Sequence, residues 1–334
     1  MPVVIKASNN GFVDATKKLI CLPSYLGLAG ERREALRRAA LATAAAAAMA
    51  LSALPAHADI VTITDSNASA TVNTGSSLGM DSLTVDGVDQ LFQQWFWYRT
   101  AASGAASPIN TLTQHSVSKP ISEGGSEAEN QMEVNYTGTY SAVVGTSVPF
   151  SIDVTYSVTG SPPSGAQLGE IIKIQNGPGS TASLPMTFIQ YNDYDLNGTA
   201  DGDTITLSGG TPPNTATQTK SGSTTTSLET VTTTLDLSHY QVEAGTSSTI
   251  LNELGGSGFT TLSDGALSAG PGDAKWAWEW DVTIPANSTF TISKERDISG
   301  VPEPASAMIM LGGMSLWSLR RPRRAKSARA QRTT

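Results

Sequence analysis

Apolar and polar residues alternate along much of the chain between Asp59 and Gly300. The run from Val148 to Gly160 keeps its large apolar residues on one parity without a break. A period of two with one apolar face indicates an antiparallel sheet with one solvated side. Similar runs bounded by Gly, Pro and Asn predict strands at 60–64, 132–144, 148–160, 170–175, 186–191, 203–207, 276–284 and 289–293. The sequence therefore predicts an all-β fold, an antiparallel β-sandwich or jelly-roll-like body.

Asp86-Gly87 separates two further apolar runs and is typical of a type I′ hairpin turn. The run that follows, 88–99, is rich in aromatic residues. Its Leu91, Trp95 and Tyr98 also fit a helical face, but the neighbouring turn signal favours a strand. Two stretches, 209–227 and 255–272, are rich in small and polar residues and predict long loops or a hinge. Whether the body forms one domain or two is open.

The leader, residues 1–58, ends in a predicted secretory signal peptide. Residues 32–58 place two Arg pairs before an Ala-rich apolar run that closes on Ala-His-Ala, so signal peptidase is expected to cut between Ala58 and Asp59. The same Arg pairs fit a twin-Arg export signal loosely. A core helix or membrane anchor is the alternative reading of the apolar run, but the run is short for a bilayer span.

The tail, residues 301–334, carries a Pro-Glu-Pro sequence, an apolar span at 305–319 and a cationic cluster. The span predicts a short C-terminal transmembrane helix, and the positive-inside rule places the body outside. The motif residues are Val301, Pro302, Glu303, Pro304, Arg320, Arg321, Arg323 and Arg324. An ordinary tail anchor is the alternative interpretation.

In this order the three parts of the tail closely resemble the PEP-CTERM sorting signal. The resemblance implies an exosortase substrate in a bacterium that makes exopolysaccharide, held first in the inner membrane and then released to the surface, outer envelope or matrix. The segments 81–99 and 188–205 also resemble uncharacterised exported PEP-CTERM proteins. That likeness implies no activity.

Charge is segregated along the chain. The body between the leader and the tail holds seven Lys and Arg against 25 Asp and Glu, a formal net charge of −18, although the whole chain has −8. Such a body repels phosphate backbones, which excludes nucleic acid as a partner. The one cysteine, Cys21, lies in the leader. The body therefore depends on its core for stability and has no disulfide.

One acidic segment begins like a calcium loop. Oxygen-bearing side chains stand at positions one, three, five and nine, and Gly198 stands at position six, as calcium loops require. The twelfth position, however, is Thr204 and lacks the usual Glu. The candidate calcium ligands are Asp193, Asp195, Asn197, Asp201 and Asp203. The alternative is an acidic turn between two strands.

Three tryptophans share one face of a predicted strand: Trp276, Trp278 and Trp280. Exposed, they would form a stacking platform for sugar rings, and Trp95 and Trp97 offer a second candidate. Buried, they are core, and aromatic ladders are more often buried. On the opposite face, Glu279 and Asp281 stand at roughly 7 Å, a spacing that glycosidase carboxyl pairs also use.

Other candidate chemistry is weak. Gly75 to Gly79 fits the G-x-S-x-G nucleophile pattern, but no helix is predicted after it. Only His115 and His239 offer imidazole bases in the body. Asn67, Asn135 and Asn197 each lie in an extended bacterial glycosylation sequon. A chain this rich in Asn, Ser and Thr readily produces such sequons by coincidence, and glycosylation is the alternative.

From these observations we expect an exported protein with a structural or adhesive role and no enzymatic activity. A carbohydrate-binding module for exopolysaccharide is the alternative, and a glycoside hydrolase using Glu279 and Asp281 is the third hypothesis. No cofactor other than calcium is indicated.

Overall fold

The computed structural model describes residues 59–100, 104–119, 129–141, 147–246, 248–256, 258 and 261–300. All of these residues belong to one compact unit that begins at Ala56. The predicted signal peptide with Ala58, and the whole sorting tail with its predicted membrane helix, lie outside the described residues. Within the described part of the chain, no helix is long and apolar enough to span a bilayer.

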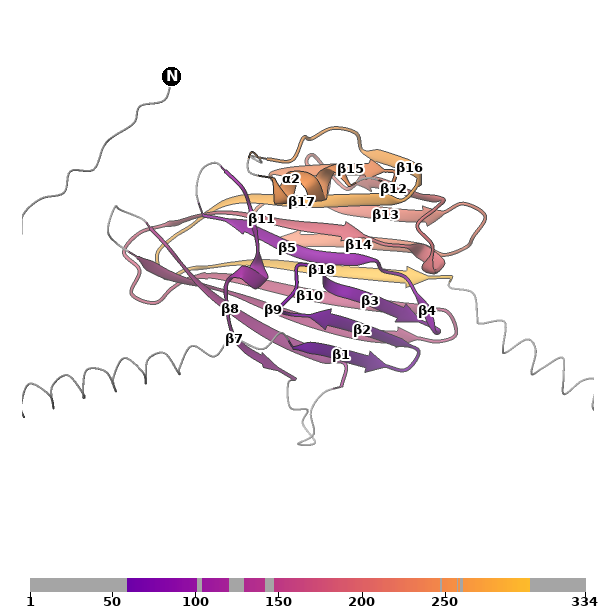
Figure 1. The fold of residues 1–334 in the computed structure, drawn as a ribbon, viewed down its shortest axis with the longest axis horizontal. Coiled ribbons are helices and arrows are strands. Elements are labelled where there is room, and N and C mark those ends of the chain that lie inside the picture. The colour runs from indigo at the N-terminus through magenta and orange to yellow at the C-terminus, as the bar shows by residue number, and fades with distance from the viewer. Residues whose placement is uncertain are drawn as a thin grey trace, which may run out of the picture. The chain divides into compact units, whose positions relative to one another are not determined.

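The described residues form two large, mainly antiparallel sheets, which confirms the all-β prediction (Figure 1). The first sheet has the order β1, β2, β3, β5, β11, β17, β15, with β4 beside β3 and β6 beside β5. Its strands are β1 (Ile60–Asp65), β2 (Ala68–Asn73), β3 (Gly79–Val85), β4 (Val88–Asp89), β5 (Gln93–Arg99), β6 (Ser107–Pro108), β11 (Leu184–Asp193), β15 (His239–Ala244) and β17 (Ala274–Ile284).

The second sheet has the order β16, β12, β13, β14, β18, β10, β9, β8, β7. Its strands are β7 (Thr113–Ser118), β8 (Gln131–Tyr140), β9 (Val148–Ser161), β10 (Gly165–Asn176), β12 (Asp203–Ser208), β13 (Thr215–Lys220), β14 (Thr226–Thr233), β16 (Ser268–Gly272) and β18 (Thr289–Ser299). The described helical elements are η1 (Ile109–Thr111), η2 (Leu196–Gly198) and α2 (Thr249–Gly255).

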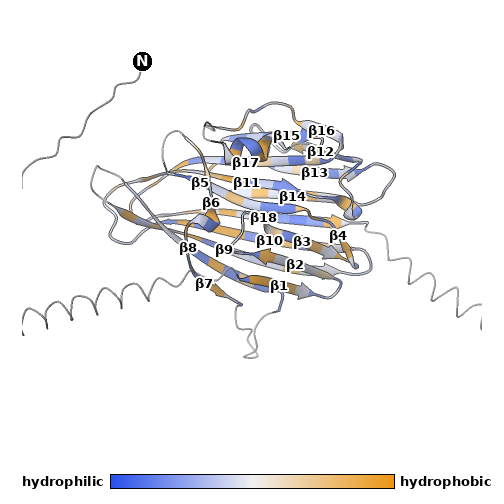
Figure 2. Cartoon of the chain, in the orientation of Figure 1, coloured by the Kyte–Doolittle hydropathy of each residue, from blue (hydrophilic) through white to orange (hydrophobic). Residues whose placement is uncertain are grey.

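Alternation along the strands builds the core between the two sheets. Hydrophobic and hydrophilic residues alternate along the strands in Figure 2. On β9, Phe150, Ile152, Val154, Tyr156 and Val158 are all buried, as their shared parity predicts. Burial of such side chains contributes about 1.5–3 kcal/mol each, so this face alone is a major stabilising element.

The turn at Asp86-Gly87 forms as predicted, but its second strand is short. Both residues have positive φ, 51° and 76°, as a type I′ turn requires, and Val85 pairs with Val88. The aromatic run continues as strand β5, which confirms the strand over the helix. β5 then pairs with β3 in parallel rather than as its hairpin partner.

The two stretches predicted as loops contain strands. Residues 209–227 include β13 and the start of β14, and residues 255–272 include β16. These segments pair within the second sheet: β13 lies between β12 and β14, β14 also pairs with β18, and β16 pairs with β12 at the edge. They are therefore part of the sheet and not a hinge between two domains.

The interior of the sandwich also holds charged residues. On the inner face of the second sheet, Glu170 stands directly opposite Lys294, and Glu229 directly opposite Arg296. Each pair forms a salt bridge, and all four residues are at most 3% exposed. Trp278, from the first sheet, donates its indole N–H to Glu229 at 2.6 Å. Charges buried at this depth require their partners.

Candidate metal site

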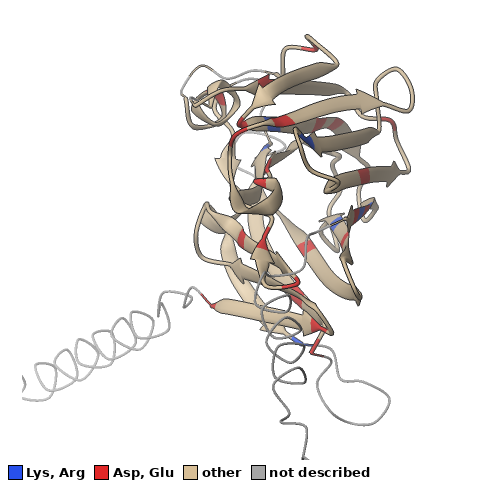
Figure 3. Cartoon of the chain, turned by 90° about the vertical axis from the view of Figure 1, so that its right-hand side faces the viewer, with Lys and Arg blue, Asp and Glu red and all other residues tan. Residues whose placement is uncertain are grey.

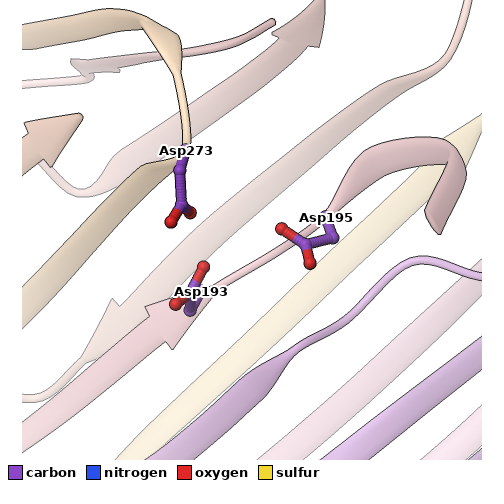
Figure 4. A group of neighbouring side chains, drawn as sticks. All are labelled: Asp193, Asp195 and Asp273. Atoms are coloured by element: carbon purple, nitrogen blue, oxygen red, sulfur yellow. The ribbon is translucent and has the colours of Figure 1, made fainter. Parts of the chain in front are cut away.

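Three carboxylates meet at one end of the sandwich. Asp193 is the last residue of β11, Asp195 precedes η2, and Asp273 lies between β16 and β17. One ligand oxygen from each lies within 4.8 Å of the others. Figure 4 shows Asp193 and Asp195 on one segment and Asp273 on another. We refer to these three residues as the carboxylate cluster.

Strand register brings the third member of the carboxylate cluster to the other two. β11 pairs antiparallel with β17, and Asp193 stands opposite Lys275, two residues after Asp273. The chain leaves the first sheet for the second after β11, and it returns from the second to the first between β16 and β17. The carboxylate cluster therefore lies where two crossovers between the sheets meet.

The carboxylate cluster has fewer donors than its charge requires. Asp193 is 3% exposed, and its Oδ2 accepts the Tyr191 hydroxyl at 3.1 Å, but its Oδ1 has no hydrogen-bond partner. Asp195 Oδ1 is also buried without a partner. One ammonium, Lys275 Nζ, lies 2.6 Å from Asp273 Oδ2. The Lys220 charge also acts on Asp195, but Lys220 lies beside Asp203 as well. The three carboxylates and Asp203 therefore share two ammonium groups, which leaves a surplus of negative charge.

The electrostatics of the carboxylate cluster follow from burial. Desolvation raises the pKa of Asp193 to about 7, an effect that the Lys275 charge opposes and that Asp273 and Asp195 reinforce. Burial, with Asp273 beside it, also raises the pKa of Asp195. Carboxyl groups with this surplus of charge are stabilised by protons or by a cation.

Only two of the five predicted calcium ligands take part in the carboxylate cluster. Asn197 instead donates to Ser223 Oγ at 2.8 Å and accepts the Thr225 hydroxyl at 2.7 Å. Asp201 is exposed, and Asp203 is buried beside Lys220. The segment therefore does not wrap around one ion as a calcium loop does. The third carboxylate of the cluster comes from Asp273, a residue too distant in sequence for local spacing to identify, and not from Asn197, Asp201 or Asp203.

The tryptophan ladder is part of the core. Trp276, Trp278 and Trp280 are fully buried, and Trp95 and Trp97 are buried on β5, which β11 separates from β17. None of these five indoles is available on the surface as a platform for sugar rings. The structure thus favours the core interpretation that the sequence left open.

The carboxyl pair on the opposite face of β17 does not form an open site. Glu279 is fully buried, and its Oε2 accepts the backbone N–H of Leu262 at 2.7 Å, while Asp281 is about half exposed. Burial raises the pKa of Glu279 to about 7. His239, opposite Glu279 on β15, forms an ion pair with Asp264 and lies 3.6 Å from Asp281. A polysaccharide has no access to the Glu279 carboxyl.

The G-x-S-x-G segment is a turn between β2 and β3. Gly79 has φ of +64°, and a Cβ there would lie 1.9 Å from the Trp95 ring. Strand β3 begins at Gly79, so the helix that a nucleophile elbow requires is replaced by a strand. The sequon amides are engaged in the fold as well: Asn67 donates to Asp86, Asn135 to Asp153 and Asn197 to Ser223.

No family model and no curated protein matches the chain. Among solved structures, a bacterial glucoamylase complexed with acarbose is similar over 79% of this chain, with 12% identity and a TM-score of 0.47. The aligned part is 36% of the glucoamylase, so the chain spans about a third of that enzyme. A galactose mutarotase-like protein from Lactobacillus casei aligns over 72% of this chain and all of its own, with 8% identity and a TM-score of 0.42.

A third similar structure is a putative kojibiose phosphorylase from the human microbiome. The alignment covers 79% of this chain and 33% of the phosphorylase, with 9% identity and a TM-score of 0.37. These names correct the expected class of protein. We expected a structural or adhesive protein without activity, whereas the similar structures are carbohydrate-active enzymes and a mutarotase-like protein. Because every TM-score is below 0.5, neither a fold family nor an activity is transferred from these structures to this chain.

Proposed function

We propose that the described body binds a divalent cation, preferentially Ca²⁺, through Asp193, Asp195 and Asp273. The observation that carries this proposal is the convergence of three carboxylates within 4.8 Å, one of them 3% exposed with an oxygen that lacks any donor. Calcium prefers six to eight hard oxygen ligands and accepts irregular geometry. Two carboxylates from one turn and one from a distant segment suit that preference.

Binding would join two distant parts of the chain. Asp193 and Asp195 follow β11, and Asp273 precedes β17, so one ion would hold both crossovers together. The strongly acidic body favours cations over anions at this surface. Figure 3 shows that Asp and Glu far outnumber Lys and Arg on the described elements. The function is therefore a cation-dependent stabilisation of the sandwich.

Calcium is expected to raise the unfolding temperature of the purified body. A ligand that binds only the folded state stabilises it by about 2.7 kcal/mol at one hundred times its dissociation constant. Titration calorimetry is expected to show one Ca²⁺ per molecule. Asp273→Asn keeps the side chain's shape but removes a ligand charge, so it should abolish both the heat of binding and the thermal shift.

Asp297→Asn provides the matched control, because Asp297 lies on the outer face of β18, away from the carboxylate cluster. This variant should bind calcium like the original protein. Equal thermal shifts in both variants, or no calcium binding by the unmodified body, would refute the proposed cation site.

We propose further that the protein is exported and that its tail is an exosortase substrate. The support is in the sequence alone: residues 32–58 precede the described body, and the Pro-Glu-Pro motif with its Arg cluster follows it. Intact-mass measurement of the protein from native envelope and medium tests both processing events. A species running from about Asp59 to near Pro304 is expected outside the inner membrane, and a retained Arg320 to Arg324 would contradict processing of the tail.

A further inference from the structure

A lysine occupies the turn that the sequence predicted as a calcium loop. Lys220 Nζ donates to the backbone oxygens of Thr199 at 2.8 Å and Asp201 at 2.7 Å, and it lies 3.5 Å from Asp203 Oδ2. Its side chain is 11% exposed, and that of Asp203 is fully buried. Three oxygens of one short segment thus surround one positive charge.

The position of this lysine is fixed by strand pairing. β12 and β13 form an antiparallel pair in which Asp203 stands directly opposite Lys220. The backbone N–H of Ser221 also donates to Gly202 at 2.8 Å, which closes the pair at this end. The ammonium group therefore reaches the turn at 195–203 from the neighbouring strand, and it is not a surface side chain that happens to fold back.

The oxygens around Lys220 are those that a hard cation prefers. Two are backbone carbonyls and one belongs to a carboxylate, the same ligand types that calcium loops use. Both carboxylate oxygens of Asp203 are buried and lack a hydrogen-bond partner, so the carboxylate retains unused acceptor capacity. Burial also raises the pKa of Asp203 to about 7 even with Lys220 beside it. The ammonium thus only partly compensates the buried carboxyl.

We propose that Lys220 is a built-in cation of this turn, and that its removal opens a second oxygen site for Ca²⁺ formed by Thr199, Asp201 and Asp203. This second site is separate from the cation site proposed above and shares none of its three ligands. The lysine makes this turn independent of metal, whereas the carboxylate cluster, with its surplus of negative charge, is not.

The test is Lys220→Met, which removes the charge and retains the aliphatic stem. Without calcium, this variant is expected to unfold at a lower temperature than the original protein. With millimolar Ca²⁺ it should bind one ion more per molecule than the original protein, and its unfolding temperature should rise by more. An unchanged number of bound ions together with an equal thermal shift would overturn the proposal.

A double variant, Lys220→Met with Asp203→Asn, separates the buried charge from other effects. The amide has nearly the same shape and no charge, so the double variant should fold without calcium and gain no extra ion. If the single variant folds only with Ca²⁺, the proposal is upheld. If it fails to fold at every calcium concentration while the double variant folds, the proposal is wrong. The double variant also identifies the site, because Lys220 acts on Asp195 of the carboxylate cluster as well. Only an extra ion that is lost together with the Asp203 charge lies at the turn, whether the original protein binds one ion or none.

Discussion

Replacement of Arg296 by Met is expected to destabilise the fold by about 3–5 kcal/mol, the usual effect of leaving a buried charge unpaired. Arg296 forms an ion pair with Glu229, donates to Ser227 Oγ at 2.9 Å and packs 3.8 Å from the centre of the Tyr194 ring. Although burial alone would raise the pKa of Glu229, Arg296 and Lys294 hold it below its usual range. Without Arg296, the Glu229 carboxyl group must either stay ionised without its ion-pair partner or take up a proton. Urea unfolding at neutral pH measures the loss.

Two further variants establish the cause. Arg296→Met combined with Glu229→Gln removes both charges, so it should recover much of the lost stability, as replacement of whole buried pairs often does. Lys173→Met changes an exposed lysine on the outer face of β10 and should shift stability by no more than about 0.5 kcal/mol. A double variant as unstable as the single one would show that packing of Arg296, and not its charge, is responsible.

Stability of the calcium-free body is expected to fall as the pH rises from about 5 to 8. Burial raises the pKa of Asp193, Asp203 and Glu279 to about 7, from ordinary values of 3.8 for Asp and 4.5 for Glu. The folded state therefore holds protons that the unfolded state has lost. Their stabilising effect is complete below the unfolded values and disappears as the pH passes through the folded ones. Each pKa unit corresponds to about 1.4 kcal/mol, so the three groups together change stability by several kcal/mol.

Urea midpoints at pH 5 and pH 8, in chelator, measure this dependence. Glu279→Gln should reduce the difference between the two midpoints, because the amide has no proton to lose and still accepts the Leu262 N–H. Calcium at pH 8 should restore the stability that is lost when Asp193 ionises, but not the stability that is lost when Glu279 ionises. Equal midpoints at the two pH values would show that these carboxyl groups are not held protonated by the fold.

Much of the fold follows from local pattern. The strands with strict apolar alternation, such as β9 and β17, form where the sequence predicts them. The Thr-rich strands β13 and β14 were missed because their buried faces carry Gln218, Ser227 and Glu229 beside Ala216 and Val231. A buried polar face has the same sequence pattern as a solvated loop, although Thr is a good strand former.

Two of the three residues of the candidate metal site could be identified from the sequence. The spacing of Asp193 and Asp195 places two carboxylates in one turn, which local reasoning detects. Asp273 reaches them only because β11 and β17 pair in one particular register. The buried pairs Glu170 with Lys294 and Glu229 with Arg296 were missed for a similar reason, since a charged residue in a strand is ordinarily assigned to the solvated face.

The last two strands of the described body lie inside their sheets and not at an edge. β17 separates β11 from β15, and β18 separates β14 from β10. Until residues 274–299 have been synthesised, β15 lacks its partner in the first sheet, and the two halves of the second sheet are not joined. The pairings that β18 makes with β10 and that β17 makes with β11 join segments far apart in sequence. Pairings of this kind form slowly, because distant segments must meet before the contacts they form offset the loss of conformational entropy. Both sheets are therefore expected to be complete only once residues 274–299 are available, although consecutive strands such as β8 and β9 can pair earlier.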